Sequence, residues 1–347
     1  MERKGAEREP QTLKGATGGP AARPSRRRGA HEVDRLRVAL CAATYRRPEG
    51  LDRLLAAIAR LQPPEAATVE VVIVDNTPEG GAALQVQEAR SRLPWPLHYV
   101  AEPRRGITFA RNSALDKATA LEADFVAFID DDEAPSPQWL AELLAVQRRS
   151  GASAVQGGVQ PLFPPGTPSW MVSSGFYENP TFPDGTELQE GHTANVLIDL
   201  SRLRALGLDF DHRFALTGGE DSMLFRDLLD AGERIVYAAD AVVYETLPPS
   251  RARLTWLLRR WYRTGNVEAE LYLRGRRDGF WRRPANALRG LLRVAVGSGL
   301  FIANVLVLGF GRKDRVIRPL YTLCRGFGIL ASTFGWNYAE YRRVHGA

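Results

Sequence analysis

A short apolar run that ends in four consecutive acidic residues limits the folds open to this chain. The run is Phe125-Val126-Ala127-Phe128-Ile129, and Asp130-Asp131-Asp132-Glu133 follows it directly. Aromatic and β-branched residues in such a run predict a buried strand. In an open parallel sheet, ligands bind beyond the carboxyl ends of the strands, so we expect the acids to lie beside a ligand. A solvated turn before the next helix is the alternative explanation.

Neighbouring carboxylates repel one another and need a counter-charge at neutral pH. A divalent cation that holds a diphosphate is the natural partner, because hard oxygen ligands suit Mg²⁺ or Mn²⁺. The sequence lacks both the Gly-x-Gly-x-x-Gly pattern after its first strand and the P-loop pattern. These absences argue against a dinucleotide dehydrogenase and a P-loop enzyme.

Predicted strands and helices alternate along the first half of the chain. Strands are expected at residues 37–42, 69–74, 97–100 and 125–129, with helices from Pro48, between the second and third strands to about Leu93, and at 106–121. This order predicts right-handed βαβ units and an α/β fold with a mostly parallel central sheet. A length of 347 residues allows one large domain with an appendage, or two domains.

Charge and cysteine content favour an ordinary globular protein in a reducing compartment. The net charge is +6, and arginines far outnumber acids over residues 251–293. The two cysteines, Cys41 and Cys324, are far apart, which indicates no disulfide scaffold and fits the cytoplasm. Residues 1–35 are rich in Gly, Pro, Ala, Arg and Glu and predict a disordered tail. We expect a solvated tail rather than a nucleic-acid or lipid contact at Arg26-Arg27-Arg28, and no nucleic acid as a partner.

Five short pieces stand in the order found in one enzyme family. They are Thr44-Tyr45-Arg46-Arg47-Pro48, Val74-Asp75-Asn76, Arg105-Gly106-Ile107-Thr108-Phe109-Ala110-Arg111-Asn112, the acidic run after Phe128-Ile129, and Gly218-Gly219-Glu220-Asp221. Over residues 36–265 the chain resembles the inverting nucleotide-sugar glycosyltransferases of family 2, and among them the succinoglycan-type exopolysaccharide glucosyltransferases. The resemblance implies a GT-A fold. We expect a catalytic domain at 36–250, a basic amphipathic helical region at 251–283 and apolar, membrane-associated helices at 284–347, the last from their composition.

The resemblance also implies a set of residues that bind the nucleotide-sugar donor, with UDP favoured over GDP or dTDP. They are Thr44, Tyr45, Arg46, Asp75, Asn76, Gly106, Arg111, Asn112, Asp130 and Asp131. Asp75 would accept a hydrogen bond from a ring N–H such as that of uracil. A turn before Thr77-Pro78 is the alternative for Asp75-Asn76. For Arg111 and Asn112 the alternative is a polar helix face.

Metal and catalytic residues follow from the same resemblance. Asp130 and Asp132 correspond to the family's Asp-x-Asp metal motif, which would hold Mg²⁺ or Mn²⁺. Relatives often add a histidine after the last core strand, where this chain has Glu245, a carboxylate that suits Mg²⁺. Asp221 would be the general base that inversion needs, with Glu220 as its neighbour in the motif. A helix cap is the alternative for this pair.

The acceptor side is assigned to Asn195, on a strand near the acceptor in relatives, and to Arg260 and Trp261. The last two belong to a basic amphipathic helix predicted over residues 254–265, with Gly265 as its stop. A membrane-facing helix without catalytic contact is the alternative.

Two apolar segments, residues 294–310 and 320–336, follow. Each falls short of the ~20 residues that a membrane span needs. Basic residues flank the first segment on both sides, which conflicts with the positive-inside tendency. We therefore expect an interfacial or re-entrant hairpin on an anionic membrane surface, at the cytoplasmic face of the inner membrane, rather than two spans. A soluble helical cap remains the alternative.

These expectations favour a metal-dependent inverting glycosyltransferase that transfers sugar to a lipid-linked glycan in polysaccharide biosynthesis. A non-catalytic scaffold that binds a nucleotide sugar or a glycan is the alternative. Asp132 and Asp221 together favour the enzyme.

Overall fold

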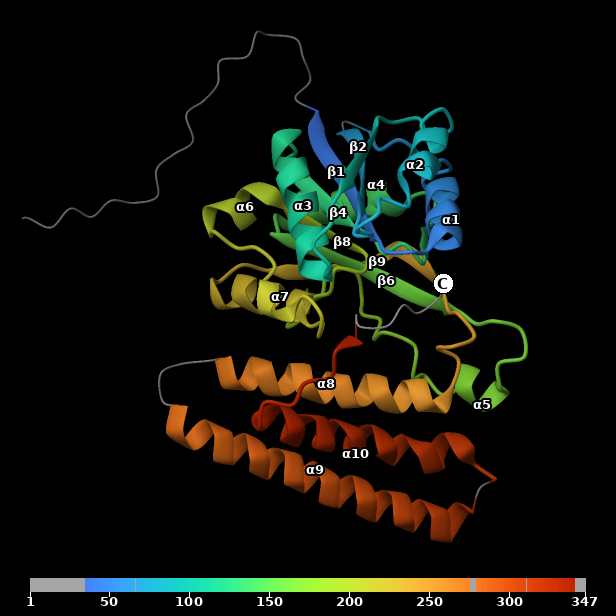
Figure 1. Cartoon of the computed structure of the whole chain (residues 1–347), viewed down its shortest axis with the longest axis vertical. Coiled ribbons are helices and arrows are strands. Elements are labelled where there is room, and N and C mark those ends of the chain that lie inside the picture. The colour runs from blue at the N-terminus through green and yellow to red at the C-terminus, as the bar shows by residue number, and fades with distance from the viewer. Residues whose placement is uncertain (1–34, 66, 275–278, 310, 341–347) are drawn as a thin grey trace, which may run out of the picture. The chain divides into compact units, whose positions relative to one another are not determined.

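The structure is a computed structural model that describes residues 35–65, 67–274, 279–309 and 311–340. The predicted tail over residues 1–35 lies outside these residues except for Arg35, and so does Phe310 at the end of the first predicted apolar segment. From Leu36 the described chain forms a sheet with helices on both faces, followed by three long helices (Figure 1).

Nine strands of the described chain form one mixed sheet in the order β3-β2-β1-β4-β8-β6-β9-β5, with β7 paired to β9. The strands are β1 (Leu36–Thr44), β2 (Ala67–Asp75), β3 (Leu97–Ala101), β4 (Phe125–Phe128), β5 (Glu133–Pro135), β6 (Ala154–Leu162), β7 (Glu187–Leu188), β8 (Val196–Asp199) and β9 (Ile235–Thr246). The parallel order predicted for the first four strands is confirmed.

The second half of the sheet is mixed, which the prediction of a mostly parallel sheet did not anticipate. β8 runs antiparallel to both β4 and β6, while β6 and β9 pair in parallel. The segment between β6 and β8 contains the short helix α5 (Ser169–Val172) and the two-residue β7. Because β8 is antiparallel to β6, the chain enters β8 at the end of the sheet where β6 ends.

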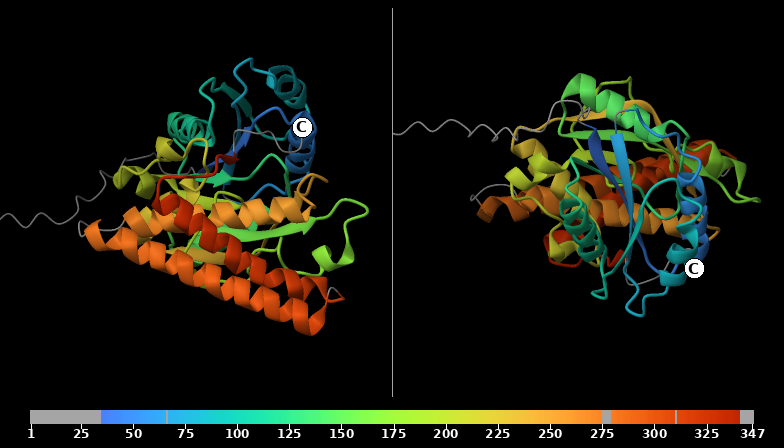
Figure 2. Two further views of the ribbon diagram at one scale, coloured as in Figure 1. Left: turned by 60° about the horizontal axis from the view of Figure 1, so that its bottom comes forward. Right: turned by 90° about the horizontal axis from the view of Figure 1, so that it is seen from above.

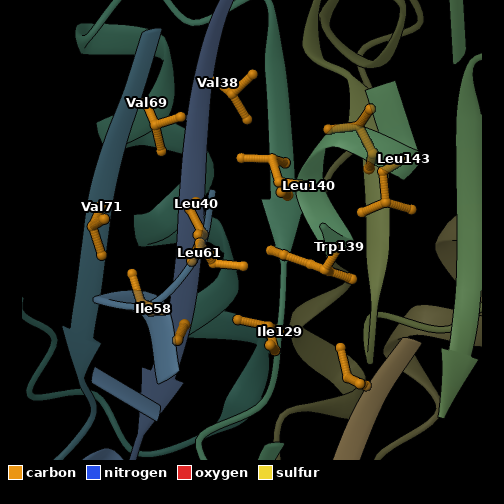
Figure 3. Close-up of a cluster of buried hydrophobic side chains, with 14 of the residues drawn as sticks. Val38, Leu40, Ile58, Leu61, Val69, Val71, Ile129, Trp139, Leu140 and Leu143 are labelled. Carbon is orange, nitrogen blue, oxygen red and sulfur yellow. The ribbon is translucent and has the colours of Figure 1, made fainter. Parts of the chain in front are cut away.

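Helices cover both faces of the sheet. The remaining helices are α1 (Pro48–Ile58), α2 (Ala83–Ala89), α3 (Ile107–Ala120), α4 (Trp139–Ser150), α6 (Leu200–Ala205), α7 (Glu220–Asp230), α8 (Leu254–Arg274), α9 (Gly279–Leu308) and α10 (Lys313–Thr333), with a 3₁₀ turn at His212–Phe214. Side chains alternate along β1: Val38 and Leu40 pack toward α1, α2 and α4 (Figure 3), whereas Ala39 and Cys41 pack toward α3, α6 and α7. One apolar cluster therefore packs on each face of the sheet and fixes the helices to it.

Helices α8, α9 and α10 form a layer of their own below the sheet. α10 packs against both α8 and α9 (Figures 1 and 2). A third apolar cluster ties this layer to the segment around α5 through Met171, Tyr177, Trp256, Trp261 and Ile317. The basic helix predicted over residues 254–265 is therefore one side of a packed bundle.

Gly265 does not end that helix, and its prediction as a stop is wrong. α8 continues to Arg274, and a Cβ at Gly265 would lie 2.3 Å from the carbonyl oxygen of Arg325 on α10. On the other side of this crossing, a Cβ at Gly328 would lie 2.0 Å from the carbonyl oxygen of Tyr262. The two glycines let the backbones of α8 and α10 approach closely.

α9 is longer than the sequence reading expected. It begins at Gly279, and an 18-residue window within Trp281–Leu308 has a mean hydropathy of 2.1, which makes the helix long and apolar enough to cross a membrane by length and composition. Among the described helices, α9 alone meets these limits. The expectation that the first apolar segment is too short for a span is therefore wrong.

The close crossing of α8 and α10 can be tested at Gly328. We expect Gly328→Ala to lower the free energy of unfolding by about 1–3 kcal/mol, the usual cost of overpacking a tight contact. Gly299→Ala on α9 is the matched control, because no heavy atom lies within 4 Å of a Cβ added there. Urea unfolding in mild detergent measures both. Equal stability of the two variants would contradict the close approach.

Candidate functional site

A pocket lies at the edge where β1 and β4 end, in line with the expected position beyond the strand ends. Residues from the loop after β1, the start of α3, the acidic turn and the end of β9 line it. They are Ala43, Thr44, Tyr45, Arg47, Asn76, Arg105, Gly106, Ile107, Ala110, Arg111, Asp130, Asp131, Asp132, Glu245 and Arg251.

Two arginines hold the acidic turn. Arg47 Nη1 donates hydrogen bonds to Asp131 Oδ1 (2.8 Å) and Asp132 Oδ2 (3.0 Å). Arg251 Nη1 donates to the same Asp132 Oδ2 (3.0 Å) and to Glu245 Oε1 (2.9 Å). The carboxylates that the sequence assigned to a cation are thus paired with guanidinium groups in this structure.

Glu245 reaches the acidic turn through strand pairing. β5 and β9 run antiparallel, with Glu133 opposite Glu245, and the Thr246 N–H donates to the carbonyl oxygen of Asp132 (2.8 Å). Glu133 is buried, and its Oε2 accepts a hydrogen bond from the Asp130 N–H (2.9 Å). The ladder therefore fixes the predicted third ligand, Glu245, beside Asp132.

Arg111 joins the acidic turn to a second acidic pair. Its Nη2 lies 3.3 Å from Asp130 Oδ1, and its Nη1 donates to Glu220 Oε1 at the start of α7. Arg111 and Glu220 are both buried. Asp221 follows on α7, where its Oδ1 accepts a hydrogen bond from the Ser222 N–H (2.7 Å). One guanidinium thus connects the predicted metal side with the predicted base side.

Burial raises the pKa of several of these carboxyl groups. Burial is the main cause at Asp131, where Arg47 opposes it and the pKa rises to about 6. At Glu220, burial opposed by Arg111 raises the pKa to about 7. Burial also raises the pKa of Asp130, Glu133 and Glu245, and the negative charge of Asp132 adds to the shift in each.

The carboxylates fit a hard divalent cation in chemistry and direction. The described residues contain no group of three or more His, Cys, Asp or Glu side chains arranged as a ready metal site. Asp132 Oδ2 and Glu245 Oε1 nevertheless converge on one guanidinium nitrogen, so both oxygens face the same positively charged point. Carboxylate oxygens are the ligands that Mg²⁺ and Mn²⁺ prefer.

Several predicted donor residues meet at the pocket. Thr44 Oγ1 donates to Asp131 Oδ2 (2.8 Å), and Tyr45 has the guanidinium of Arg105 5.5 Å from its ring centroid. Asn76 Oδ1 accepts from the Gly106 N–H (2.9 Å), which orders the loop before α3. Gly106 has a φ of 141°, and a Cβ there would lie 2.7 Å from Ala215. The loop conformation therefore requires glycine at this position.

Three predicted donor residues do not reach the pocket. Arg46 is exposed and pairs with Glu79 at 3.0 Å. Asp75 is fully buried: its Oδ1 accepts from the Thr77 N–H, and its Oδ2 accepts from the Ala82 N–H and the Tyr99 hydroxyl. Asn112 exchanges two hydrogen bonds with the backbone of Phe210. In this structure the hydrogen bonds of Asp75 are those of the alternative turn, and Asn112 lies on α3 as the alternative polar helix face proposed.

The predicted acceptor residues also lie outside the pocket. Asn195 is fully buried, its Nδ2 donates to the carbonyl oxygens of Gly158 and Ala241, and its Oδ1 accepts from Trp139 Nε1. Trp261 is buried in the third apolar cluster. Arg260 stacks 5.2 Å from the Trp256 ring centroid, and the charge of Glu245 acts on it. Of the three, Arg260 is thus the residue placed near the site.

Comparison with known proteins agrees with this geometry. The sequence profile of the family described as "Glycosyl transferase family 2" matches residues 40–204. The chain is 35% identical over 308 residues to the succinoglycan biosynthesis protein ExoM of Rhizobium meliloti (strain 1021), an alignment that covers 88% of this chain and 95% of that protein. The chain belongs to glycosyl transferase family 2.

Solved structures show that this glycosyltransferase has the GT-A fold. The mannosyltransferase PcManGT from Pyrobaculum calidifontis, in complex with GDP-Man and Mn²⁺, aligns with a TM-score of 0.56 and 21% identity over 84% of this chain and 86% of that chain. S. aureus TarS 1-349 in complex with UDP-GlcNAc aligns with a TM-score of 0.51 and 17% identity over 87% and 93% of the two chains. At these identities the comparison concerns the fold alone.

The sequence reading of this glycosyltransferase missed three arginines in the pocket. Arg47, Arg105 and Arg251 all line it. The demand of the acids for counter-charge was recognised, but it was assigned to a cation alone. One sequence feature could have identified these arginines as pocket residues: each lies in a loop shortly before a predicted helix and close to the end of a strand.

The raised pKa of Glu220 in the glycosyltransferase can be tested through pH-dependent stability. A carboxyl with a pKa of about 7 in the fold, above its ordinary value, stabilises the protein at low pH, and this contribution is lost as pH rises through 7. Between pH 5 and 8 we expect wild type to lose about 2–3 kcal/mol of unfolding free energy relative to Glu220→Gln, at about 1.4 kcal/mol per pH unit. Urea unfolding at both pH values measures this. Parallel pH profiles would rule it out.

Proposed function

We propose that this glycosyltransferase moves a sugar, with inversion, from a UDP-sugar to a lipid-linked glycan acceptor in exopolysaccharide biosynthesis. The single observation that carries the proposal is the Arg111 bridge between Asp130 and Glu220. The bridge brings together a carboxylate pocket suited to a metal-bound diphosphate and an acidic pair suited to proton transfer.

Each chain residue has a distinct part in this proposal. Thr44, Tyr45, Asn76 and Gly106 form the wall against which the nucleotide lies. Arg111 positions Asp130 and Glu220 relative to each other. Asp221 takes the proton of the acceptor hydroxyl on the face opposite the leaving group, which is the geometry that inversion demands. Glu220 stays buried behind it and fixes the start of α7 through Arg111.

Asp130, Asp132 and Glu245 are the residues that would hold Mg²⁺ or Mn²⁺. A bound cation would supply positive charge to the departing nucleoside diphosphate. The converging oxygens of Asp132 and Glu245 support this assignment. The Mn²⁺ in the PcManGT complex supports it at the level of the shared fold.

The acceptor and the location rest on a relative and on the helical layer. ExoM is a succinoglycan biosynthesis protein, which favours a polysaccharide product here. α9 lies on the side of the helical layer away from the sheet (Figure 1). Many of its large apolar side chains are exposed, among them Leu288, Leu292, Val296 and Leu300. α10 packs along α9 and α8, so a flat layer on the cytoplasmic membrane face suits the bundle better than α9 crossing alone.

The catalytic start of α7 borders this layer. A Cβ at Gly219 would lie 2.7 Å from Val267 on α8. Asp221 therefore lies two residues from a glycine that packs on the helical layer. An acceptor whose lipid anchor lies in the membrane under α9 would meet the base at this border.

The role of Asp221 can be tested by substitution. We expect Asp221→Asn to lower sugar transfer at least ~10²-fold, the usual scale for loss of a general base, because the amide cannot take the acceptor proton. Donor binding should remain largely intact, since Asp221 does not line the donor pocket. Near-normal transfer by a folded variant would refute the assignment.

Release of nucleoside diphosphate measures this and separates an enzyme from a scaffold. The reaction needs a membrane-bound preparation, extracted lipid acceptors and several nucleotide sugars. Asp230→Asn, at the other end of α7, is the control and should keep wild-type turnover. Absence of any turnover across this set by wild type would favour the binding scaffold.

Membrane docking can be tested on the exposed face of α9. Leu292 and Val296 are 57% and 53% exposed and one helical turn apart. We expect the double variant Leu292→Asp/Val296→Asp to bind anionic vesicles at least ~10-fold more weakly, because each buried apolar side chain contributes about 1.5–3 kcal/mol. Vesicle sedimentation measures the binding.

Leu84→Asp is the control, because Leu84 is 74% exposed on α2, far from the layer in sequence. It should bind vesicles as wild type does. Equal binding by all three proteins would contradict docking through α9. Labelling of a cysteine at Lys313 from the outer side of the membrane would show a crossing and overturn the peripheral arrangement.

A further inference from the structure

Arg251 occupies a central place between the two carboxylates proposed for the cation. It lies between the end of β9 and the start of α8, and its side chain is 15% exposed. Its Nη1 lies 3.0 Å from Asp132 Oδ2 and 2.9 Å from Glu245 Oε1. Its backbone carbonyl accepts a hydrogen bond from the Tyr177 hydroxyl (2.9 Å). The backbone is therefore anchored, and the long side chain determines where the charge lies.

Arg251 carries an unused donor. Among the described residues, its Nε is buried and has no hydrogen-bond partner. A buried donor without an acceptor is costly, so this group indicates a ligand that the protein itself does not supply. Arg251 lines the donor pocket. A phosphate oxygen is the acceptor that a guanidinium binds with two parallel hydrogen bonds.

The guanidinium and a divalent cation exclude each other at this point. Mg²⁺ lies about 2.0–2.1 Å from its carboxylate oxygens. A cation on Asp132 Oδ2 and Glu245 Oε1 would therefore lie against the Nη1 group that now contacts both oxygens, and like charges repel. Arg47 Nη1 contacts the same Asp132 Oδ2, but its second partner is Asp131 Oδ1, so of these two arginines Arg251 is the one that touches both oxygens proposed for the cation.

We propose that Arg251 is an exchange residue: it holds Asp132 and Glu245 together while the pocket is empty, and turns to the diphosphate of the donor when a divalent cation takes the carboxylates. This inference rests on the proposed function, in which the two carboxylates bind the cation. It gives Arg251 opposite effects on two ligands. The residue competes with the cation and assists the diphosphate.

Mn²⁺ binding without nucleotide tests the competition. The full-length protein in detergent is titrated with Mn²⁺, and the free ion is followed by electron paramagnetic resonance. We expect Arg251→Ala to bind Mn²⁺ about tenfold more tightly than wild type, because a competing charge-assisted hydrogen bond is lost. Arg251→Lys should lie between them, since the ammonium keeps the charge without the planar fork. Equal or weaker Mn²⁺ binding by Arg251→Ala would overturn the proposal, because structural damage alone weakens a site.

UDP binding at saturating Mn²⁺ tests the second effect. We expect Arg251→Ala to bind UDP about tenfold more weakly than wild type, and uridine, which has no phosphate, equally well. Unchanged UDP affinity in Arg251→Ala would show that Arg251 does not bind the diphosphate, and the proposal would be rejected. Both measurements use equilibrium binding, so neither depends on knowing the sugar or the acceptor.

Two further variants separate this inference from the metal assignment. Arg253→Ala removes an exposed arginine two residues along the chain and should leave both affinities unchanged. Asp132→Asn should abolish Mn²⁺ binding in both the wild-type and the Arg251→Ala background. Mn²⁺ binding that survives Asp132→Asn would show that the proposed cation site itself is wrong. If Asp132→Asn abolishes Mn²⁺ binding while wild type and Arg251→Ala bind Mn²⁺ equally well, the cation site stands and only the exchange is rejected.

Discussion

Burial of the carboxylates that follow β4 is the constraint on which the rest of the site depends. A buried charge without a partner costs several kcal/mol, so the fold must deliver positive charge to this turn. Arg47 comes from the loop before α1, Arg111 from α3 and Arg251 from the loop before α8. Three separate elements are thus fixed relative to the sheet by the same turn. The pocket exists where they meet.

These arginines do not remove the demand for positive charge. The pKa of Asp130, Asp131, Glu133 and Glu245 stays raised with the arginines in place, because burial outweighs them and Asp132 adds its own negative charge. A site with this excess favours a further cation. The same excess favours a ligand that arrives together with one, as a metal-bound diphosphate does.

What the sequence could predict was local, and what it missed was long-range. The acidic turn follows directly from a buried strand, and Glu245 follows from the end of β9, so both could be placed from neighbouring residues. Three of the arginine–acid pairs, Arg47 with Asp131, Arg111 with Glu220 and Arg251 with Asp132, join residues 84, 109 and 119 positions apart, and no local pattern pairs them.

Polar residues at strand ends show the same dependence on tertiary structure. Asp75 and Asn195 have the residue types of a ligand site, but backbone groups and neighbouring side chains use their hydrogen bonds. Gly265 has the residue type of a helix stop, but close helix packing requires it. A residue type gives the chemistry available at a position, and only the tertiary structure decides which partner uses it.

The helical layer is part of the site because α8 touches both of its acidic centres. Arg251, just before α8, holds Asp132 and Glu245, while Val267 in the middle of α8 packs on Gly219, next to Glu220 and Asp221. α8 is in turn fixed to α10 at Gly265 and Gly328, where no side chain fits between the backbones. A shift of the α8–α10 pair would therefore move the diphosphate side and the base side together. With the acceptor proposed above, anchored in a membrane, this rigid connection would keep the distance between the proposed donor site and the proposed base independent of how the layer lies on the lipid.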